Sequence, residues 1–196
     1  NLEIVRIISE LGQNLAEGEL FQFSLASDIV IDEEAYFEVI DKKTASLMRA
    51  SIAIGAITGG AGEELISRLA HVGGILGICF QIRDDIFDYY NEDVGKPTGN
   101  DIKEGKITLP LIYALHNAPE SARAEMGEVI ESRDYTDANI ARLLRFAKDH
   151  GGVEYAYDKM NSLLAQAEKI ILGFPFDEEF KTVMLLFLAY LRDRSF

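Results

Sequence analysis

The sequence predicts an all-α protein without a sheet. Apolar residues recur at three- and four-residue spacing along nearly the whole chain, and no stretch of useful length alternates apolar and polar residues as a strand does. With 48% hydrophobic residues, a chain of 196 residues can close one sizeable core. We therefore expect about eight helices forming a single helical domain over residues 1–196.

The first half of the chain predicts three helices. The first covers residues 2–24 and carries an apolar stripe. Asp32 is a suitable N-cap for a second helix over residues 33–58, which we expect to break or kink at residues 41–44. A glycine-rich connector then leads into a long apolar helix over residues 63–90. Its Gly73, Gly74 and Gly77 would let a neighbouring helix approach closely.

The second half begins with a long polar segment. Residues 91–106 are rich in glycine and too long for a tight turn, and loops of this size are often functional. Helical spacing then resumes. The further helices expected are residues 107–116, 119–131, 137–150, 152–172 and 177–192.

Composition excludes several classes of function. The formal charge of −14 makes nucleic acid and anionic membrane surfaces unfavourable partners, so any phosphate-bearing substrate must meet local cations or a metal.

The single cysteine, Cys79, has no partner for an intrachain disulfide, which indicates a reducing compartment, and we expect a cytoplasmic protein. The uninterrupted apolar runs of the chain are shorter than the roughly 20 residues of a membrane helix, so we expect no transmembrane segment. No basic, apolar and small-residue sequence marks the start as a secretory signal, and because Asn1 opens almost directly into a helix we expect a cut end.

An acidic turn near the end of the long helix is the first candidate for chemistry. Asp84 and Asp88 lie about 40° apart on a helical wheel, Gln81 lies within about 60° of Asp84, and Asp85 is adjacent. Carboxylates gain nothing from a helix C-terminus and repel one another at this spacing. Hard oxygen ligands one turn apart suit Mg²⁺, which completes its coordination with water and phosphate. The alternative interpretation is a solvated acidic patch.

The segment that follows carries two lysines, Lys96 and Lys106, each directly after a glycine. A diphosphate bridged to Mg²⁺ keeps an excess of negative charge, and lysine is a common partner for that charge. Two such lysines behind the acidic turn favour a diphosphate site over a solvated patch.

These residues resemble the trans-prenyl (polyprenyl) diphosphate synthase family. Residues 80–111 are similar to the second aspartate-rich region of that family, with its Gly-Lys and Asp-x-x-x-Gly-Lys-x-Thr-Leu-Pro elements. Residues 16–22 are similar to the family's Gly-Glu/Gln-x-x-Gln/Asp helix, and residues 36–45 match its Tyr-x-x-x-Ile-x-x-Lys-Thr-Ala element. The resemblance implies an isoprenoid-synthase-type helical bundle. It also implies a homodimer, for which the face of residues 65–79 is a candidate.

The resemblance also implies a reaction and a set of roles. An allylic prenyl diphosphate would lose diphosphate to form a carbocation, which alkylates isopentenyl diphosphate. Dipoles aimed at the developing charge would stabilise it, and Mg²⁺ would act as a Lewis acid on the leaving group. The implied metal ligands are Asp84, Asp85 and Asp88; the implied diphosphate-binding residues are Lys43, Lys96 and Lys106; and the implied catalytic residues are Lys43, Thr44 and Gln81.

The sequence departs from the family in one large respect. The family uses two aspartate-rich regions that face each other, and the sequence contains only the later one. The early lysine and arginine residues that bind isopentenyl diphosphate in the family are missing as well. We therefore expect the carboxyl-terminal part of a family member, an incomplete bundle that is inactive by itself. The product chain length stays open.

Two alternatives remain. A non-catalytic subunit of a heteromeric prenyl synthase would keep the fold and lose metal ligands, yet the later motif is whole. A helical interaction protein could use the acidic face to bind basic partners, but the Lys43-Thr44 pair, Gln81 and the two Gly-Lys elements argue against it.

Overall fold

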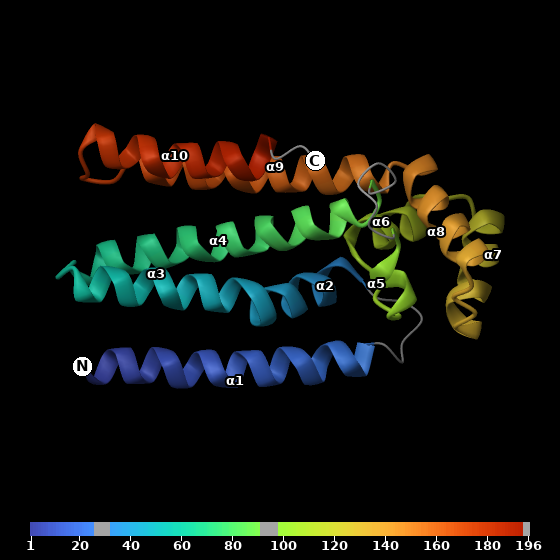
Figure 1. The fold of residues 1–196 in the computed structure, drawn as a ribbon, viewed down its shortest axis with the longest axis horizontal. Coiled ribbons are helices and arrows are strands. Elements are labelled where there is room, and N and C mark those ends of the chain that lie inside the picture. The colour runs from blue at the N-terminus through green and yellow to red at the C-terminus, as the bar shows by residue number, and fades with distance from the viewer. Residues whose placement is uncertain (26–31, 91–97, 194–196) are drawn as a thin grey trace. The chain divides into compact units, whose positions relative to one another are not determined.

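The computed structural model describes residues 1–25, 32–90 and 98–193. These residues divide into two compact units, and Figure 1 labels their helices. The first unit comprises Asn1–Phe21, Glu38–Gln81 and Met160–Phe196, and the second comprises Gln22–Phe37 and Ile82–Lys159. That all 196 residues form one domain stays a prediction.

The described residues form helices and contain no strand, so the predicted all-α class is confirmed. Most predicted boundaries fall within two or three residues of the observed ones. The elements are α1 (Leu2–Leu25), α2 (Glu33–Ile40), the π-helix η1 (Asp41–Ala45), α3 (Ser46–Thr58), α4 (Glu63–Phe87), α5 (Asn100–Lys103), α6 (Leu109–Asn117), α7 (Glu120–Ser132), α8 (Asp137–Asp149), α9 (Gly152–Leu172) and α10 (Glu178–Asp193).

The start of α2 and its break follow from local chemistry. The Asp32 carboxylate accepts the backbone N–H of Ala35 (2.7 Å), which confirms the predicted N-cap. The predicted kink is the π-helix η1, where the Ser46 N–H reaches back five residues to the Asp41 carbonyl. Such π turns are rare and often lie at functional positions.

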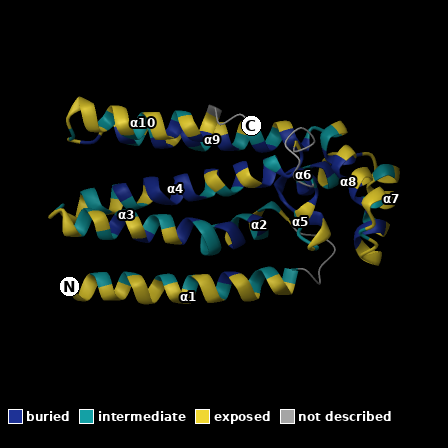
Figure 2. Ribbon diagram, in the orientation of Figure 1, coloured by how far each residue is buried: buried dark blue, intermediate teal, exposed yellow. Residues whose placement is uncertain are grey.

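The first unit has its tightest packing where α4 meets η1 and α3. A Cβ on Gly77 would lie 2.5 Å from Ala45 Cα, and one on Gly73 would lie 3.0 Å from the Met48 carbonyl oxygen. The predicted close approach of a neighbouring helix is therefore confirmed. Both glycines are buried, and Figure 2 shows several buried stretches of α4 in dark blue. The glycines of this helix pack inside the chain against α3 and η1, which does not favour a homodimer through them, and the homodimer itself stays a prediction.

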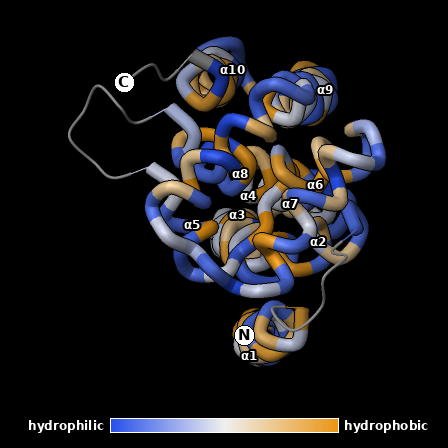
Figure 3. The backbone as a smooth tube through the Cα atoms, turned by 90° about the vertical axis from the view of Figure 1, so that its right-hand side faces the viewer, coloured by the Kyte–Doolittle hydropathy of each residue, from blue (hydrophilic) through white to orange (hydrophobic). Residues whose placement is uncertain are grey.

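Within the first unit, α1 approaches η1 most closely at one small residue. Gly18 is its buried position, and a Cβ there would lie 2.8 Å from both Lys42 Cβ and Lys43 Cγ. Several apolar side chains of α1 are exposed instead, and Figure 3 shows hydrophobic residues of this helix in orange.

α4 is also the one described helix long and apolar enough to cross a membrane by length and composition. Half of its most apolar window is buried inside the structure, as in core helices that pass the same test. The absence of a transmembrane segment stays a prediction.

The second unit is built on α6, α7 and α8 with the start of α9. Gly152 lets α9 begin against α6, since a Cβ there would lie 1.9 Å from the Pro110 carbonyl oxygen. Gly99 has a left-handed φ of 76°, and its missing Cβ leaves room for Ile140 of α8. Both glycines therefore hold the segment around α5 and α6 close to its neighbours.

Candidate functional site

The acidic turn lies at the C-terminal end of α4, in the second unit. Asp84 is exposed, whereas Asp85 and Asp88 are 3% and 9% exposed. The buried carboxylates therefore need hydrogen-bond donors from the protein, because a buried charge without partners is costly.

Asp85 takes one of its donors from α2. The Tyr36 hydroxyl, 5% exposed, donates to Asp85 Oδ2 at 2.6 Å. Burial, followed by the charge of Asp85, raises the pKa of Tyr36 well above its ordinary value, so the hydroxyl keeps its proton as a donor. This contact joins two residues 49 positions apart in the sequence.

Asp88 takes its donors from the segment that begins α5. Its Oδ1 accepts the Asn100 N–H at 2.9 Å, and its Oδ2 accepts the Asp101 N–H at 3.1 Å. Its backbone carbonyl also accepts the Gly99 N–H at 3.1 Å. Three consecutive amides therefore bond to a single residue, which fixes the start of α5 against the end of α4.

Lys106 follows α5 and lies in an acidic environment. Its Nζ is 2.6 Å from Glu104 Oε2 and 3.5 Å from Asp101 Oδ1. Burial by itself would lower the pKa of Lys106, but the Glu104 hydrogen bond and the Asp101 charge outweigh burial and raise it. The side chain is therefore a charged ammonium group at neutral pH.

Asp101 shows that negative charge is in excess here. Burial, followed by the charge of Asp88, raises the pKa of Asp101, and Asp84 adds to this while Lys106 opposes it. Asp84, Asp88 and Lys106 are thus close enough to act on one carboxyl group.

The other predicted site residues lie in the first unit or outside the residues that the structure describes. Lys43 Nζ is 2.5 Å from Glu19 Oε2, and Thr44 Oγ1 donates to Gln81 Oε1 at 2.8 Å. The structure therefore brings Thr44 and Gln81 together, and it separately pairs Glu17 with Lys42 (2.8 Å). Lys96 lies outside the described residues.

Among the described residues, no group of three or more histidine, cysteine, aspartate or glutamate side chains is placed to hold a metal by itself. The donor set still fits a hard cation. Asp84 offers exposed carboxylate oxygens. The charges of Asp88 and Asp84, which add to burial in raising the pKa of Asp101, would be offset by a cation. Mg²⁺ typically uses one or two carboxylates with water and phosphate, so it needs no complete protein cage.

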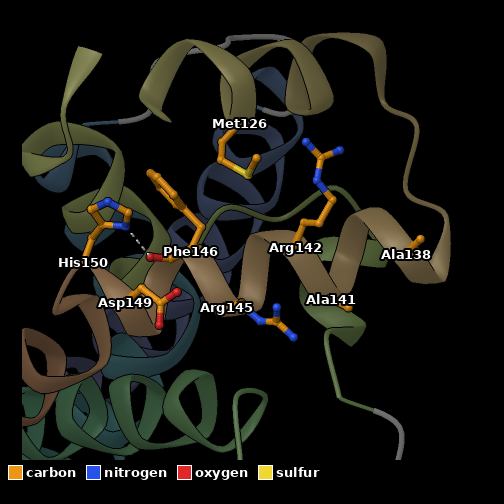
Figure 4. Close-up of a pocket in the computed structure, with 8 residues that line it drawn as sticks. All are labelled: Met126, Ala138, Ala141, Arg142, Arg145, Phe146, Asp149 and His150. Atoms are coloured by element: carbon orange, nitrogen blue, oxygen red, sulfur yellow. Dashed lines mark hydrogen bonds between the residues drawn. The ribbon is translucent and has the colours of Figure 1, made fainter. Parts of the chain in front are cut away.

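A separate pocket of about 380 Å³ lies between α7 and α8 (Figure 4). It contains none of the predicted site residues, and two of its polar side chains are already engaged. Arg142 pairs with Glu125, and His150 Nδ1 lies 2.9 Å from the Phe146 carbonyl oxygen. The lining residues are Met126, Ala138, Ala141, Arg142, Arg145, Phe146, Asp149 and His150.

Comparison with known proteins identifies the family. The polyprenyl synthetase family model matches residues 1–146, which include the acidic turn, α5 and Lys106. The chain belongs to the polyprenyl synthetase family. The expected isoprenoid-synthase fold is confirmed, since 99% of the chain superposes on 64% of geranylgeranyl pyrophosphate synthase from Bacteroides thetaiotaomicron with a TM-score of 0.92 and 42% identity.

Polyprenyl synthetases that resemble the chain are longer than it is. It is 34% identical to a short chain isoprenyl diphosphate synthase of Methanothermobacter thermautotrophicus over 79% of the chain and 48% of that protein. It is 33% identical to octaprenyl diphosphate synthase of Haemophilus influenzae over 100% of the chain and 60% of that protein. A polyprenyl synthase from Caulobacter crescentus, solved with calcium and isoprenyl diphosphate, superposes with a TM-score of 0.88, 28% identity and coverage of 100% and 60%. The chain thus spans about half to three fifths of these curated relatives.

Two residues beside the acidic turn had no predicted role. Tyr36 and Asp101 both stand inside motifs that carry the resemblance, at the first position of each. Their places in those motifs were a usable signal, but their contacts with Asp85 and with Asp88 and Lys106 depend on the fold.

Proposed function

We propose that this chain forms the later part of an enzyme that joins an allylic prenyl diphosphate to isopentenyl diphosphate, giving a longer trans-prenyl diphosphate. The observation that carries the proposal is the acidic turn with its exposed Asp84, in the same unit as Lys106. Membership of a family whose similar members are named as prenyl diphosphate synthases supports it.

The proposal includes a divalent metal, which we take to be Mg²⁺. Asp84 would be its nearest ligand, with Asp85 and Asp88 coordinating directly or through water. Bound there, the metal would withdraw electrons from the leaving diphosphate. The Caulobacter relative solved with calcium and isoprenyl diphosphate supports a divalent metal of this kind.

The chain's own residues would do the remaining work. Lys106, Lys96 and Lys43 would bind the allylic diphosphate through its negative oxygens. Thr44 and Gln81 would present oxygen atoms to the carbocation, and their 2.8 Å hydrogen bond would hold both side chains in place. In the structure Lys43 pairs with Glu19, and Lys106 pairs with Glu104 and Asp101. Diphosphate would therefore have to compete with these carboxylates.

Three further expectations belong to the same proposal. The chain alone should not turn over substrate, because the first aspartate-rich motif and the isopentenyl diphosphate site are absent from its sequence. The enzyme should be cytoplasmic, as its single cysteine suggests, and should form a homodimer. Detectable condensation of the two diphosphates by the pure 196-residue chain would refute the first of these.

The proposal is tested by binding. Thermal unfolding of the chain would be followed with MgCl₂ alone, with inorganic pyrophosphate alone and with both. Ligands that bind the folded state alone raise its stability, so we expect the midpoint to rise only with the combination. Asp84→Asn should abolish that rise. An unchanged midpoint with both ligands would favour a helical interaction protein. A non-catalytic subunit would be favoured if the intact protein lacked a second acidic motif.

A further inference from the structure

We propose that Asp88 is a positioning residue, which holds the segment of residues 99–106 and thereby Lys106. Of the two modes of metal coordination considered above for Asp88, direct or through water, only the one through water then remains. The inference rests on the proposed function, because it assigns a division of labour within the same site. It starts from the different surroundings of Asp84 and Asp88, which lie one helical turn apart.

Both carboxylate oxygens of Asp88 are already engaged. Oδ1 accepts the Asn100 N–H and Oδ2 accepts the Asp101 N–H, and the side chain is 9% exposed. A cation bound directly to either oxygen would compete with a backbone N–H for that oxygen. It would also have to lose most of its water shell, because Asp88 is buried. The exposed Asp84 has no such constraint.

The two bonds explain why a carboxylate stands at this position. Two neighbouring N–H groups at the start of α5 need two acceptor oxygens on one short side chain. An aspartate supplies both, whereas an asparagine of the same shape supplies one acceptor and turns an NH₂ donor toward the other N–H. Hydrogen bonds to a charged acceptor are also stronger than neutral ones.

A continuous path of contacts leads from Asp88 to Lys106 through Asp101. The Asp101 N–H bonds to Asp88, the Asp101 carbonyl accepts the Lys106 N–H at 2.8 Å, and the Asp101 carboxylate lies 3.5 Å from Lys106 Nζ. The turn between them closes at Gly105, whose φ is 77°. Losing the bonds at Asp88 would therefore loosen the segment that carries the Lys106 ammonium group.

Hydrogen exchange tests this without any ligand. We would compare amide exchange of peptides covering residues 98–108 in the wild type, Asp88→Asn and Asp84→Asn. The two variants remove the same charge from the same turn. Positioning by Asp88 predicts exchange about tenfold faster or more in Asp88→Asn and unchanged exchange in Asp84→Asn. Equal exchange in wild type and Asp88→Asn would overturn the inference.

A double-mutant cycle tests the link to Lys106. Calorimetry would measure the affinity for inorganic pyrophosphate in excess MgCl₂ for the wild type, Asp88→Asn, Lys106→Met and the double variant. If Asp88 acts through Lys106, both single variants weaken binding and the double variant binds as Lys106→Met does, within about twofold. Effects that multiply would overturn the inference and favour an independent role at the metal.

The outcomes separate this inference from the proposed function. Absence of pyrophosphate binding by the wild type would sink the proposed function, whereas hydrogen exchange would still decide whether Asp88 holds residues 99–106. Binding by the wild type together with independent effects of Asp88 and Lys106 would sink the inference alone. If Asp88→Asn unfolds, Asp88→Ser, which keeps one acceptor, replaces it, and the same exchange and binding criteria apply.

Discussion

Three identical side chains in the acidic turn have different environments. Asp84 faces solvent, Asp85 is held by a tyrosine hydroxyl, and Asp88 is held by two backbone N–H groups. The cost of burying a carboxylate is offset only where donors surround it. The residue best placed for an incoming cation is therefore the one that the fold leaves without such donors in the described surroundings.

Replacing Asp84 tests this difference at the level of catalysis. In a prenyl synthase that contains this chain, Asp84→Ala should lower kcat by about 100-fold or more, because Lewis-acid stabilisation typically supplies several kcal/mol and about 1.4 kcal/mol is a factor of ten. Asp158→Ala, which removes an exposed carboxylate from α9, is the control and should leave kcat within about twofold. Steady-state kinetics would decide, and near-normal turnover by Asp84→Ala would remove its proposed role.

Sequence alone could select these residues but not their partners. Spacing and residue type are local properties, so the three aspartates and the two Gly-Lys elements can be recognised from the order of residues. The bond between Tyr36 and Asp85 joins residues 49 positions apart in the sequence. The bonds from Asn100 and Asp101 to Asp88 form only because the tertiary fold brings the start of α5 back to the end of α4. Contacts of this kind follow from tertiary packing.

The helices were the most predictable elements because apolar periodicity repeats over several turns. Asp32 and the break after Ile40 were also recognisable, from an N-cap side chain and from a run of polar residues. The short α5 was missed, since four residues within a glycine-rich segment carry no periodic signal. For the α4 glycines, the predicted close approach of a helix was confirmed, but the neighbour is a helix of the same chain. Small residues indicate that a helix packs closely and do not identify which one.

Glycine packing predicts the stability of two variants. Gly77→Ala should lower the free energy of unfolding by about 1–3 kcal/mol, because its Cβ would collide with the backbone of Ala45 at 2.5 Å. Gly55→Ala in α3 is the matched control, since no atom lies within 4 Å of its added Cβ. It should raise stability by roughly 0.5–1 kcal/mol through helix propensity. Urea unfolding should therefore show a lower unfolding free energy for Gly77→Ala and a higher one for Gly55→Ala than for the wild type. The same change in both variants would contradict the packing described for α4.

The N-terminus of α2 is anchored to α9 by Glu33. Its carboxylate accepts hydrogen bonds from the Tyr155 hydroxyl and the Lys159 ammonium group, both at 2.6 Å. Tyr155 also stacks on Tyr113 of α6, with ring centroids 4.1 Å apart. Burial would raise the pKa of Glu33, but the bonds from Lys159 and Tyr155 outweigh it and lower the pKa.

This lowered pKa predicts how stability depends on pH. A carboxyl group with a depressed pKa in the folded state contributes stability above its ordinary pKa and loses it as pH falls through the folded value. The difference in unfolding free energy between wild type and Glu33→Gln should be about 0.5–1 kcal/mol at pH 7, given partial exposure, and should shrink below about pH 4. Tyr155→Phe should give a smaller difference in the same direction. A difference that grows on acidification, measured by urea unfolding, would contradict the anchor.

At the scale of the whole chain, both units are assembled from distant segments. α4 and α9 each contribute residues to both, and the first unit draws on both ends of the sequence. Such interleaving is invisible to periodicity, which treats each helix separately. It also means that neither unit corresponds to one continuous stretch that could be cut out by itself.

The exposed apolar side chains of α1 are where we now expect the homodimer contact. Val5, Ile8 and Leu20 are 58%, 55% and 71% exposed, and runs of this kind often mark protein interfaces. Light scattering after size exclusion should show a dimer, and the pair Val5→Glu and Ile8→Glu should shift it toward monomer. Arg6→Gln, an exposed polar change on the same helix, is the control. An unaltered dimer in the paired variant would exclude this surface.

The π turn at η1 has a consequence for how this chain can vary. A π turn contains one residue more than an α turn. Removing a single residue there would let the helix run on without interruption, but it would swing Lys43 and Thr44 by about 100° relative to one flank. The length of this short stretch is therefore constrained alongside the identities of Lys43 and Thr44.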